Sequence, residues 1–390
     1  MKKRILLISV AVLVLAGAVA AGLFFFSGKG LKTVDNEYCF TLEGEWEGAK
    51  DFSEGLAAVK KDGKWGFIDT DGNVVIDLRY DSANSFSEGL AAVQNGGKWG
   101  YVDKNGTVVI PITLDATFAF SEGIAAYKSG YYFGYIDKEG NKVADAIYTE
   151  ASAFREGIAC VKKENRYGYI DKNGKEITEF VYGLESDPSE GMIPVFYGDT
   201  ALGTNTGYLK TDGTPGLDFL WYDAKPFSEG LAAACDEFTK PYGYIDKTGA
   251  YVIAPAWDSA EPFSQGRALV EKERKFTFID TTGAQITEAF YGKAYSFTES
   301  GFARVANSSA AGWSFGFLDQ SGAEAIPLKY DGAMDFHNGH AAVCKGEKWG
   351  FINAEGIEIT GMLWTDANEF TEDGIARVRS GDTYGFVKLK

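Results

Sequence analysis

The feature that most constrains this chain is a phrase that returns along almost its whole length. Residues 61–76 read KDGKWGFIDTDGNVVI, and related copies recur ten times with a basic period of 34 residues. One anchor of each copy is a Phe-Ser-Glu-Gly step such as residues 52–55. The other is an aromatic-Gly-aromatic step, or a variant of it, which begins at Trp65, Trp99, Phe133, Tyr167, Thr206, Tyr242, Phe276, Phe315, Trp349 and Tyr384. Such a period predicts a repeat architecture in which each unit packs against its neighbours.

The spacing between the two anchors shows where the repeat tolerates insertions. From each aromatic-Gly step to the next Phe-Ser-Glu-Gly position, which is Pro188 in one copy, the distance is always 21 residues. In the other direction it is usually 13 residues, but it is 18 before Thr206, 15 before Tyr242, 18 before Phe315 and 14 before Tyr384. All length changes therefore fall in one hairpin of the repeat.

Alternation within one copy predicts three strands, at residues 56–60, 64–69 and 73–76. We expect type I′ hairpin turns at both Asp62-Gly63 and Asp71-Gly72. Because both faces of such a sheet are largely apolar, each sheet must pack between two others. Aromatic residues at 15% and 48 glycines against 9 prolines also favour strands and tight turns. The expected fold is all-β, a propeller-like tandem array of about ten three-stranded antiparallel meanders.

The two ends of the array are complementary. Phe40-Thr41-Leu42 aligns with the last strand of a repeat, whereas the final copy stops one strand short at residues 385–387. An N-terminal strand that completes the last sheet would close a ring. Ten blades exceed the common range of about 4 to 8. The sequence therefore leaves a closed ring and an open spiral as alternatives.

The copies at residues 64–69 (KWGFID) and 348–353 (KWGFIN) make the chain resemble the WG-repeat (KWG-repeat) family, over about residues 38 to 390. The resemblance implies a bacterial β-rich repeat protein, often exported, that binds or scaffolds. It brings no established catalytic residues. Thr206 replaces the aromatic residue in one copy and Thr277 the glycine in another, so we expect altered packing there.

The first 30 residues differ from the rest. Lys2, Lys3 and Arg4 precede 22 uncharged residues, 5–26, which is long enough to cross a bilayer. We expect residues 1–30 to form a single-pass anchor in the cytoplasmic membrane and residues 31–390 to form an extracytoplasmic repeat domain. The alternative is cleavage at Ala18-Val19-Ala20 and secretion.

The charge of the chain bears on its binding partners, and its cysteine content bears on disulfide bonds. Residues 31–390 contain 34 basic and 55 acidic residues, a formal charge of −21, which argues against nucleic acid. The four cysteines, Cys39, Cys160, Cys235 and Cys344, are too scattered for a disulfide scaffold. Cys235 and Cys344 occupy the same place in repeats that are not neighbours, so we expect no bridge between them.

No motif predicts catalysis. Residues 69–73, DTDGN, open like a calcium-binding loop, but the position of the required glutamate is Tyr80, so a turn is expected. Glu54 and its counterparts recur with the fold, which indicates a turn or capping role. The only histidines, His337 and His340, occupy ordinary repeat positions. We predict no catalytic residues, no cofactor and no metal site.

The hairpin that accepts insertions is the best candidate for binding, because function usually develops on variable loops of a constant scaffold. Three insertions, around residues 197–205, 236–241 and 307–313, should project from one rim and carry Tyr197, Phe238 and Trp313. These side chains would stack on sugars or peptides; neutral surface insertions are the alternative. The preferred function is a non-catalytic module that binds or scaffolds envelope polymers or proteins. An envelope glycan hydrolase and a purely structural spacer stay open.

Overall fold

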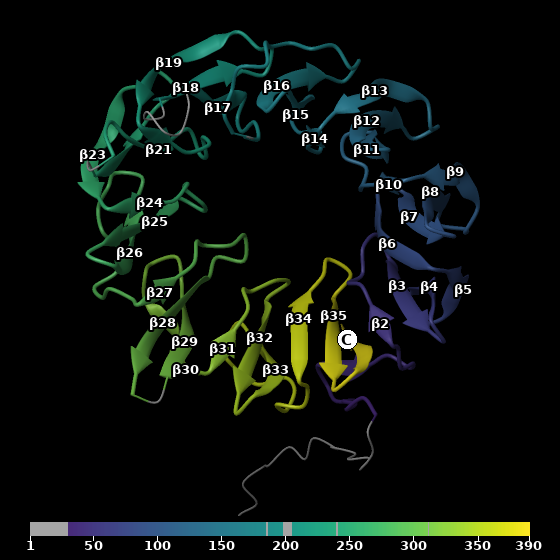
Figure 1. The fold of residues 1–390 in the computed structure, drawn as a ribbon. Coiled ribbons are helices and arrows are strands. Elements are labelled where there is room, and N and C mark those ends of the chain that lie inside the picture. The colour runs from purple at the N-terminus through teal and green to yellow at the C-terminus, as the bar shows by residue number, and fades with distance from the viewer. Residues whose placement is uncertain (1–29, 185, 198–204, 239–240, 311) are drawn as a thin grey trace, which may run out of the picture.

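The computed structural model describes residues 30–184, 186–197, 205–238, 241–310 and 312–390. These residues form ten small antiparallel sheets that follow one another around a ring (Figure 1), which is a ten-bladed β-propeller. The blades are numbered here in chain order. In each blade the first strand lies nearest the ring axis and the last lies at the outside, as β6 to β9 show in Figure 1.

Blades 1 to 5 use the strands up to β19. From the inner to the outer strand, blade 1 contains β2 (Gly48–Ala49), β3 (Leu56–Lys61), β4 (Lys64–Asp69) and β5 (Val74–Tyr80); blade 2 contains β6 (Ser82–Ser87), β7 (Leu90–Asn95), β8 (Lys98–Asp103) and β9 (Val108–Leu114); blade 3 contains β10 (Ala116–Thr117), β11 (Ile124–Ser129), β12 (Tyr132–Asp137) and β13 (Lys142–Tyr148); blade 4 contains β14 (Glu150–Ala151), β15 (Ile158–Lys163) and β16 (Arg166–Asp171); blade 5 contains β17 (Met192–Tyr197), β18 (Asn205–Lys210) and β19 (Pro215–Trp221).

Blades 6 to 10 use the remaining strands, and blade 10 borrows its outer strand from the N-terminus. Blade 6 contains β20 (Asp223–Ala224), β21 (Ala232–Cys235), β22 (Tyr242–Ile245) and β23 (Tyr251–Trp257); blade 7 contains β24 (Ser259–Ala260), β25 (Arg267–Lys272) and β26 (Lys275–Asp280); blade 8 contains β27 (Lys293–Ala294), β28 (Ala303–Ser309), β29 (Gly312–Leu318) and β30 (Glu324–Tyr330); blade 9 contains β31 (Gly332–Ala333), β32 (His340–Lys345) and β33 (Lys348–Asn353); blade 10 contains β34 (Asp366–Phe370), β35 (Ile375–Ser380), β36 (Thr383–Leu389) and β1 (Cys39–Thr41).

The three predicted strands are present, and most blades add an inner strand that sequence reasoning missed. Most inner strands are only two residues long, which is too short to show an alternating pattern of their own. In the described residues, blades 4, 7 and 9 have no regular outer strand, and isolated bridges such as Tyr167 to Tyr182 take its place.

Three turns of each repeat have distinct geometries. Ser53 and Leu56 exchange backbone hydrogen bonds across Glu54 (φ 55°) and Gly55 (φ 84°), so the Ser-Glu-Gly step is a two-residue type I′ turn. Asp62 (φ 49°) and Gly63 (φ 76°) form the type I′ turn that the sequence predicts.

The type I′ prediction for Asp71-Gly72 is wrong. Only Gly72 has a positive φ, 88°, and its N–H donates to the Asp69 carbonyl at 3.0 Å. This is a type I turn followed by a glycine bulge. The Asp69 carboxylate selects it by accepting hydrogen bonds from the N–H groups of Asp71 at 3.0 Å and Asn73 at 2.9 Å.

The glycine of the aromatic-Gly step is required by the outer strand. Opposite Gly66 the ladder skips, because Trp65 pairs with Tyr80 and Phe67 with Ile76. The bulging strand passes so close that a Cβ at Gly66 would lie 2.4 Å from the Ile76 carbonyl oxygen. The same approach of a bulging outer strand, at 2.5 to 2.6 Å, recurs at Gly100, Gly134, Gly243 and Gly316. At Gly350 of blade 9, the carbonyl oxygen of Gly361 in the irregular outer segment comes equally close, at 2.6 Å.

The described residues divide the hydrophobic core into ten clusters, one between each pair of neighbouring blades. Between blades 1 and 2, for example, Phe67 and Tyr80 pack against Phe86 and Val93. The residue six positions before each Phe-Ser-Glu-Gly step, aromatic in every copy except for Leu114, packs at these junctions, as Tyr80 does at 2% exposure. Stability therefore comes from repetition of one junction.

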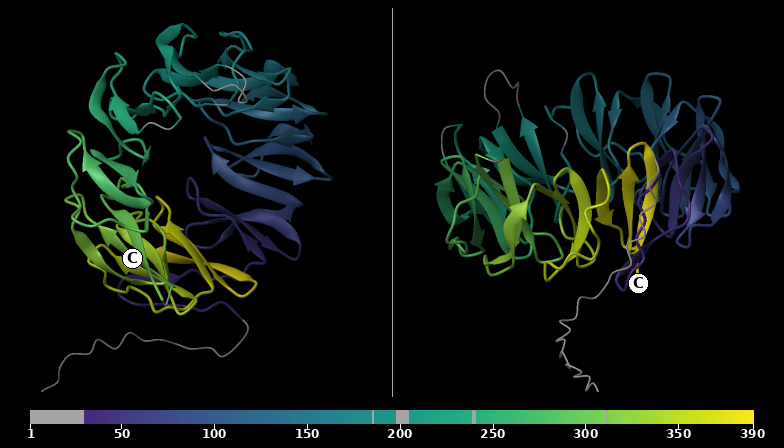
Figure 2. Two further views of the ribbon diagram at one scale, coloured as in Figure 1. Left: turned by 60° about the vertical axis from the view of Figure 1, so that its left-hand side comes forward. Right: turned by 90° about the horizontal axis from the view of Figure 1, so that it is seen from below.

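The ring is closed, which decides the alternative that the sequence leaves open. Strand β1 pairs antiparallel with β36, with Cys39 opposite Leu389 and Thr41 opposite Val387. Figure 2 shows the first and last strands of the chain side by side. The junction between blades 10 and 1 has its own core, which includes Trp46, Phe52 and Phe386.

The strands run roughly along the ring axis, so the connections form two opposite faces (Figure 2). The turn face carries the Ser-Glu-Gly turns and the Asp turns such as residues 69–73. The hairpin face carries the hairpins that join the second and third strands of each blade. Within the described ranges no helix is long and apolar enough to span a bilayer. Residues 1–29, which contain most of the predicted anchor, lie outside those ranges.

Candidate ligand-binding face

The hairpin face carries the three side chains that the sequence singles out. Tyr197 ends β17 of blade 5, Phe238 follows β21 of blade 6, and Trp313 lies in β29 of blade 8. All three belong to hairpins that join the second and third strands, which places them on one face. Whether they bind a ligand stays a prediction.

The three side chains have different surroundings. Phe238 is 77% exposed and its ring lies 5.3 Å from that of Tyr222 in the same blade. Tyr197 is 56% exposed, and residues 198–204 of its hairpin lie outside the described ranges. Among the described contacts none joins any two of the three residues.

Trp313 is held inside its own blade. Its ring covers Gly292, where a Cβ would approach the ring to 2.9 Å, and the Lys293 Nζ atom lies 4.2 Å from the ring centroid. The cation–π contact and the tight packing orient the indole. Trp313 is therefore a preorganised, half-buried side chain, whereas Phe238 and Tyr197 project into solvent.

Sequence reasoning missed the most exposed aromatic cluster of this face, which lies in blade 3. Tyr131 is 88% exposed and Tyr132 is 48% exposed, both in the hairpin between β11 and β12. Phe118, on the inner strand side of the same blade, is 47% exposed, and its ring lies 5.9 Å from that of Phe133. Tyr131 and Tyr132 form the blade 3 aromatic cluster.

A signal for this cluster was present in the repeat alignment. Tyr131 and Tyr132 stand where blade 2 has Gly97 and Lys98. Because blade 2 forms the same turn with glycine and lysine at these positions, the turn does not require the two tyrosines. The hairpin of blade 3 has the usual length, so the pattern of insertions does not point to these two tyrosines.

The blade 3 hairpin is fixed by a carboxylate. Asp115 accepts a hydrogen bond from the Gly130 N–H at 2.7 Å and an ion pair from Lys98 of blade 2 at 2.5 Å. The Lys98 hydrogen bond, together with the Gly130 N–H, holds the pKa of Asp115 below its usual value. The Tyr131-Tyr132 step is thus presented by an anchored turn, which lowers the ordering cost of binding.

The turn face, by contrast, uses its polar groups to hold the ring together. The Ser53 Oγ donates to the Phe86 carbonyl of the next blade at 2.8 Å, and Glu54 accepts from the Gly89 N–H at 2.9 Å. The glutamate contact recurs for Glu88, Glu122, Glu156, Glu190 and Glu229. The capping interpretation of these repeated glutamates is confirmed.

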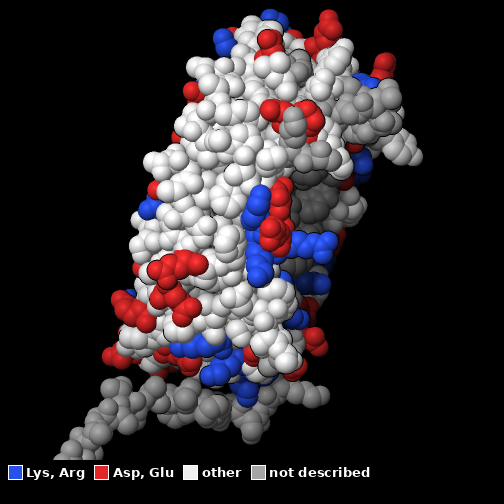
Figure 3. Space-filling model, turned by 90° about the vertical axis from the view of Figure 1, so that its left-hand side faces the viewer, with Lys and Arg blue, Asp and Glu red and all other residues white. Residues whose placement is uncertain are grey.

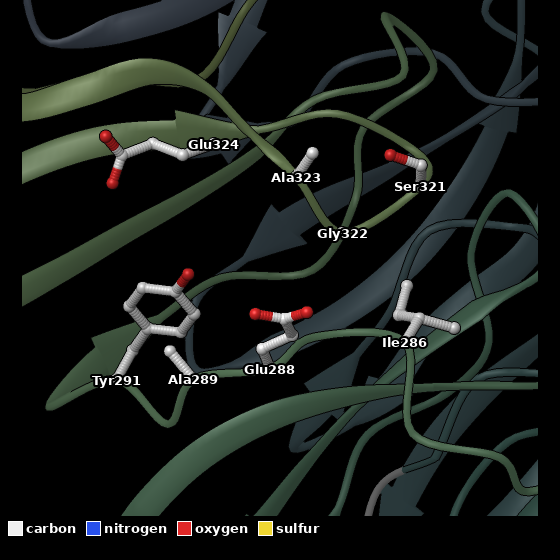
Figure 4. A pocket seen from close by; sticks show the side chains of 8 residues that line it. All are labelled: Ile286, Glu288, Ala289, Tyr291, Ser321, Gly322, Ala323 and Glu324. Carbon is white, nitrogen blue, oxygen red and sulfur yellow. The ribbon is translucent and has the colours of Figure 1, made fainter.

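A notch of about 450 Å³ opens at the outer rim between blades 7 and 8 (Figure 4). It exists because blade 7 lacks a regular outer strand in the described residues, and its walls include Glu288, Tyr291 and Glu324. Burial, and to a lesser degree the nearby Glu324 carboxylate, raise the pKa of Tyr291. Figure 3 shows a wide area without charged side chains on the side of the molecule that faces left in Figure 1.

The histidines do not form a metal centre with their surroundings. The Nδ1 atom of His340 lies 2.7 Å from the Asn338 carbonyl oxygen, and its ring contacts Phe370 at 5.4 Å. In the described part of the chain, no group of three or more histidine, cysteine, aspartate or glutamate side chains is arranged to hold a metal ion. All four cysteines are buried, and none of them forms a disulfide bond.

One comparison with a solved structure supports the fold. The chain resembles a structure described as the eukaryotic initiation factor, with 8% identity and a TM-score of 0.52 over 90% of this chain and 98% of that one. This likeness concerns the fold alone. The chain also matches PorZ, a surface component of the type-IX secretion system of Porphyromonas gingivalis, at 12% identity and a TM-score of 0.27. The match covers 88% of this chain and 57% of that chain.

The sequence comparisons concern the repeat itself. No curated protein sequence matches the chain. A family model described as WG containing repeat matches at residues 40–65, 65–99, 99–132, 133–167, 167–200, 207–237, 242–276, 276–307, 315–349 and 349–384. Ten matched copies cover nearly the whole ring, and the chain therefore belongs to the WG containing repeat family.

Proposed function

We propose that this protein is a non-catalytic binding module of the bacterial cell envelope that contacts wall glycan through aromatic side chains of its hairpin face. The observation that carries the proposal is the Tyr131-Tyr132 hairpin, which exposes two aromatic rings where the repeat needs only glycine and lysine. Exposed aromatic rings on an anchored turn are suited to stacking on the apolar faces of sugar rings.

The charge of the domain supports an uncharged polymer as the partner. Residues 31–390 carry a formal charge of −21, which disfavours anionic polymers and nucleic acid. Phe238 and Tyr197 add exposed rings on the same face, in blades 6 and 5. A polymer that runs across several blades would gain from such spaced contacts.

The proposal includes a tether at the cytoplasmic membrane. The uncharged run 5–26 behind three basic residues supports an anchor that leaves the ring outside. The chain enters the ring at the junction of blades 9 and 10, where the Nε1–H of Trp364, in the outer segment of blade 9, donates to the Lys32 carbonyl at 2.8 Å. Secretion after cleavage of the leader is the alternative outcome of a fractionation experiment.

The test is co-sedimentation of residues 30–390, which contain every blade and the ring closure, with isolated cell-wall sacculi. The matched variant is Tyr131→Gly with Tyr132→Lys, which copies the Gly96-Gly97-Lys98 turn of blade 2 and should fold normally. We expect saturable binding by the parent and a loss of at least tenfold in the variant. A second variant with the three insertions trimmed tests Tyr197, Phe238 and Trp313.

The same samples separate the other functions. Absence of binding by the parent would reject the wall-glycan version and leave an envelope protein as partner. We expect no release of soluble sugar ends from the sacculi, and release would contradict a non-catalytic role. A purely structural spacer predicts no saturable binding to sacculi or to envelope proteins.

A further inference from the structure

The turn face has a cavity of about 720 Å³ over blades 7 to 10, on the side of the ring opposite the proposed glycan contacts. Its walls include Glu299, Ser300, Phe302, Ala354 and Glu372. None of these residues belongs to the site proposed above. Several of them depart from the residues that other copies of the repeat have at the same positions.

At four other junctions a lysine fills the corresponding space. Lys104 of blade 2 binds Glu54 of blade 1, with its Nζ 3.2 Å from the carboxylate and 2.9 Å from the Glu54 carbonyl oxygen. The same lysine-to-glutamate ion pair, at 3.0 to 3.1 Å, recurs in Lys138–Glu88, Lys172–Glu122 and Lys247–Glu190. An ammonium group on the turn face is thus a regular element of this ring.

At the junction of blades 8 and 9 both members of the pair are replaced. Ala354 stands in the place of the lysine, and Ser300 precedes the turn glycine in the place of the glutamate. The Ser300 Oγ donates to the Phe336 carbonyl at 2.9 Å, which keeps the junction closed. The shorter side chains of Ala354 and Ser300 leave more open space at this part of the cavity.

The cavity nevertheless keeps negative charge. The turns of blades 8 and 10 are one residue longer than the others, as the hydrogen bond from the Thr298 N–H to the Phe302 carbonyl at 3.0 Å shows. The additional residues are Glu299 and Glu372, both exposed at the cavity. The lining residues include no lysine or arginine.

The other two carboxylates of the wall are already engaged. Glu369 accepts the Asp335 N–H at 3.1 Å, and Asp335 forms an ion pair with Arg304, whose Nε lies 3.1 Å from the carboxylate. Burial raises the pKa of Asp335, and the Arg304 charge opposes that rise. Glu299 and Glu372 are therefore the charges available to a ligand.

The floor of the cavity is aromatic. Phe302, which replaces the leucine of other copies, stacks on Phe336 with ring centroids 4.3 Å apart and an interplanar angle of 27°. An aromatic face beside carboxylates favours an organic cation, whose charge and CH₂ groups both gain from the contact. The described side chains hold no three-ligand group suited to a metal ion.

We propose that this cavity binds an aliphatic primary ammonium group, which occupies the place that a lysine fills at four other junctions. The aliphatic chain of the ligand lies over Phe302, and its ammonium group faces Glu299 and Glu372. Free diamines and the lysine side chain of a polypeptide share this chemistry.

The test is calorimetric titration of the full chain, in a non-ionic detergent, with 1,5-diaminopentane, N-acetyl-lysine methylamide and 1-pentanol. We expect saturable binding of at least one of the two amines, weakened by added salt, and none of the alcohol. Binding of the diamine alone would identify a free diamine as the source, whereas equal binding of the lysine derivative would identify a polypeptide. Failure of both amines to bind saturably would overturn the proposal.

The key variant is Ala354→Lys, which rebuilds the lysine of the other junctions and therefore is compatible with the fold. Its own ammonium group fills the cavity, and we expect amine affinity to fall at least tenfold while the thermal unfolding midpoint does not decrease. Phe302→Leu restores the repeat residue and should weaken binding severalfold. Unchanged affinity in Ala354→Lys would show that the amines bind elsewhere and would reject the site. Glycan binding by the hairpin face is unaffected by either result.

Discussion

The rings of Phe52 in blade 1 and Phe386 in blade 10 meet edge to face, with centroids 5.0 Å apart and an interplanar angle of 74°. The contact copies those inside the chain, such as Phe67 with Phe86 at 4.9 Å and 62°. Residues more than 330 positions apart thus make the same contact as residues in successive repeats. The ends of the chain are joined by one more ordinary junction.

Because the two contacts are equivalent, truncation of either phenylalanine side chain should lower the free energy of unfolding by the same amount. Phe52→Ala should lower the free energy of unfolding by about 3 to 5 kcal/mol, as expected for a buried phenylalanine, and Phe86→Ala should cost about the same. Urea denaturation of the two variants measures the comparison. A Phe52→Ala protein as stable as the parent, beside a destabilised Phe86→Ala protein, would contradict a closed ring.

The glycine of the aromatic-Gly step should resist substitution only where the backbone of the following outer segment passes close over it. Gly66→Ala places a Cβ 2.4 Å from a backbone oxygen and should cost about 1 to 3 kcal/mol or more. Gly168→Ala is the control, because its Cβ would meet atoms no closer than 3.1 Å in a blade without a regular outer strand. Equal unfolding midpoints for the two variants would refute this explanation.

The ion pair between Arg377 and Asp51, at the junction of blades 10 and 1, should couple the effects of substitutions at these two residues on stability. The Arg377 Nε lies 2.8 Å from Asp51, and Arg377 stands where blade 1 has Ala58. Arg377→Ala alone should destabilise the ring, whereas Arg377→Ala with Asp51→Ser copies the junction of blades 1 and 2 and should recover part of the loss. A double-mutant cycle should give a coupling energy of about 1 kcal/mol; additive effects would contradict the coupling.

The Asp turns predict loss of stability in acid. Hydrogen bonds from the N–H groups of Thr107 and Asn105 hold the pKa of Asp103 below its ordinary value. A carboxylate with a lowered pKa in the folded state stabilises the fold above its unfolded pKa, near 4, and that contribution is lost as pH falls through the folded pKa.

Substitution with asparagine tests this origin of the pH dependence. Asn353 already forms the same turn in blade 9, with its Oδ1 accepting from the Ile357 N–H at 2.9 Å. Asp103→Asn should therefore keep the turn and make the unfolding midpoint less sensitive to pH between 5 and 2. Replacement of several turn aspartates should enlarge the effect, and an unchanged pH profile would argue against it.

The buried thiols should be inert in the native ring. Burial raises the pKa of Cys39 to about 12, with Lys390 opposing the rise. Because the thiolate is the reactive form, a thiol reagent at pH 8 should modify Cys39 only after unfolding. Titration of native and denatured protein should give none and four reactive thiols; rapid modification of the native ring would contradict the buried placement.

Much of the candidate binding face could be predicted from spacing, because only the second-to-third-strand hairpin changes length. The positions of Tyr197, Phe238 and Trp313 on one face follow from that rule. The blade 3 aromatic cluster escaped it because Tyr131 and Tyr132 are substitutions in a hairpin of normal length. Comparison of residues at each repeat position, in addition to lengths, would have found them.

The sequence by itself determined the all-β fold, the number of repeats, the three main strands and the stacking of blades. These properties depend on short-range alternation and on a period that every copy shares. The tertiary structure alone decided that the ring closes, because closure depends on how a small rotation at each junction adds up over ten blades. It also decided where replaced residues leave a cavity, since Ala354 and Ser300 become neighbours only when blades 8 and 9 pack together.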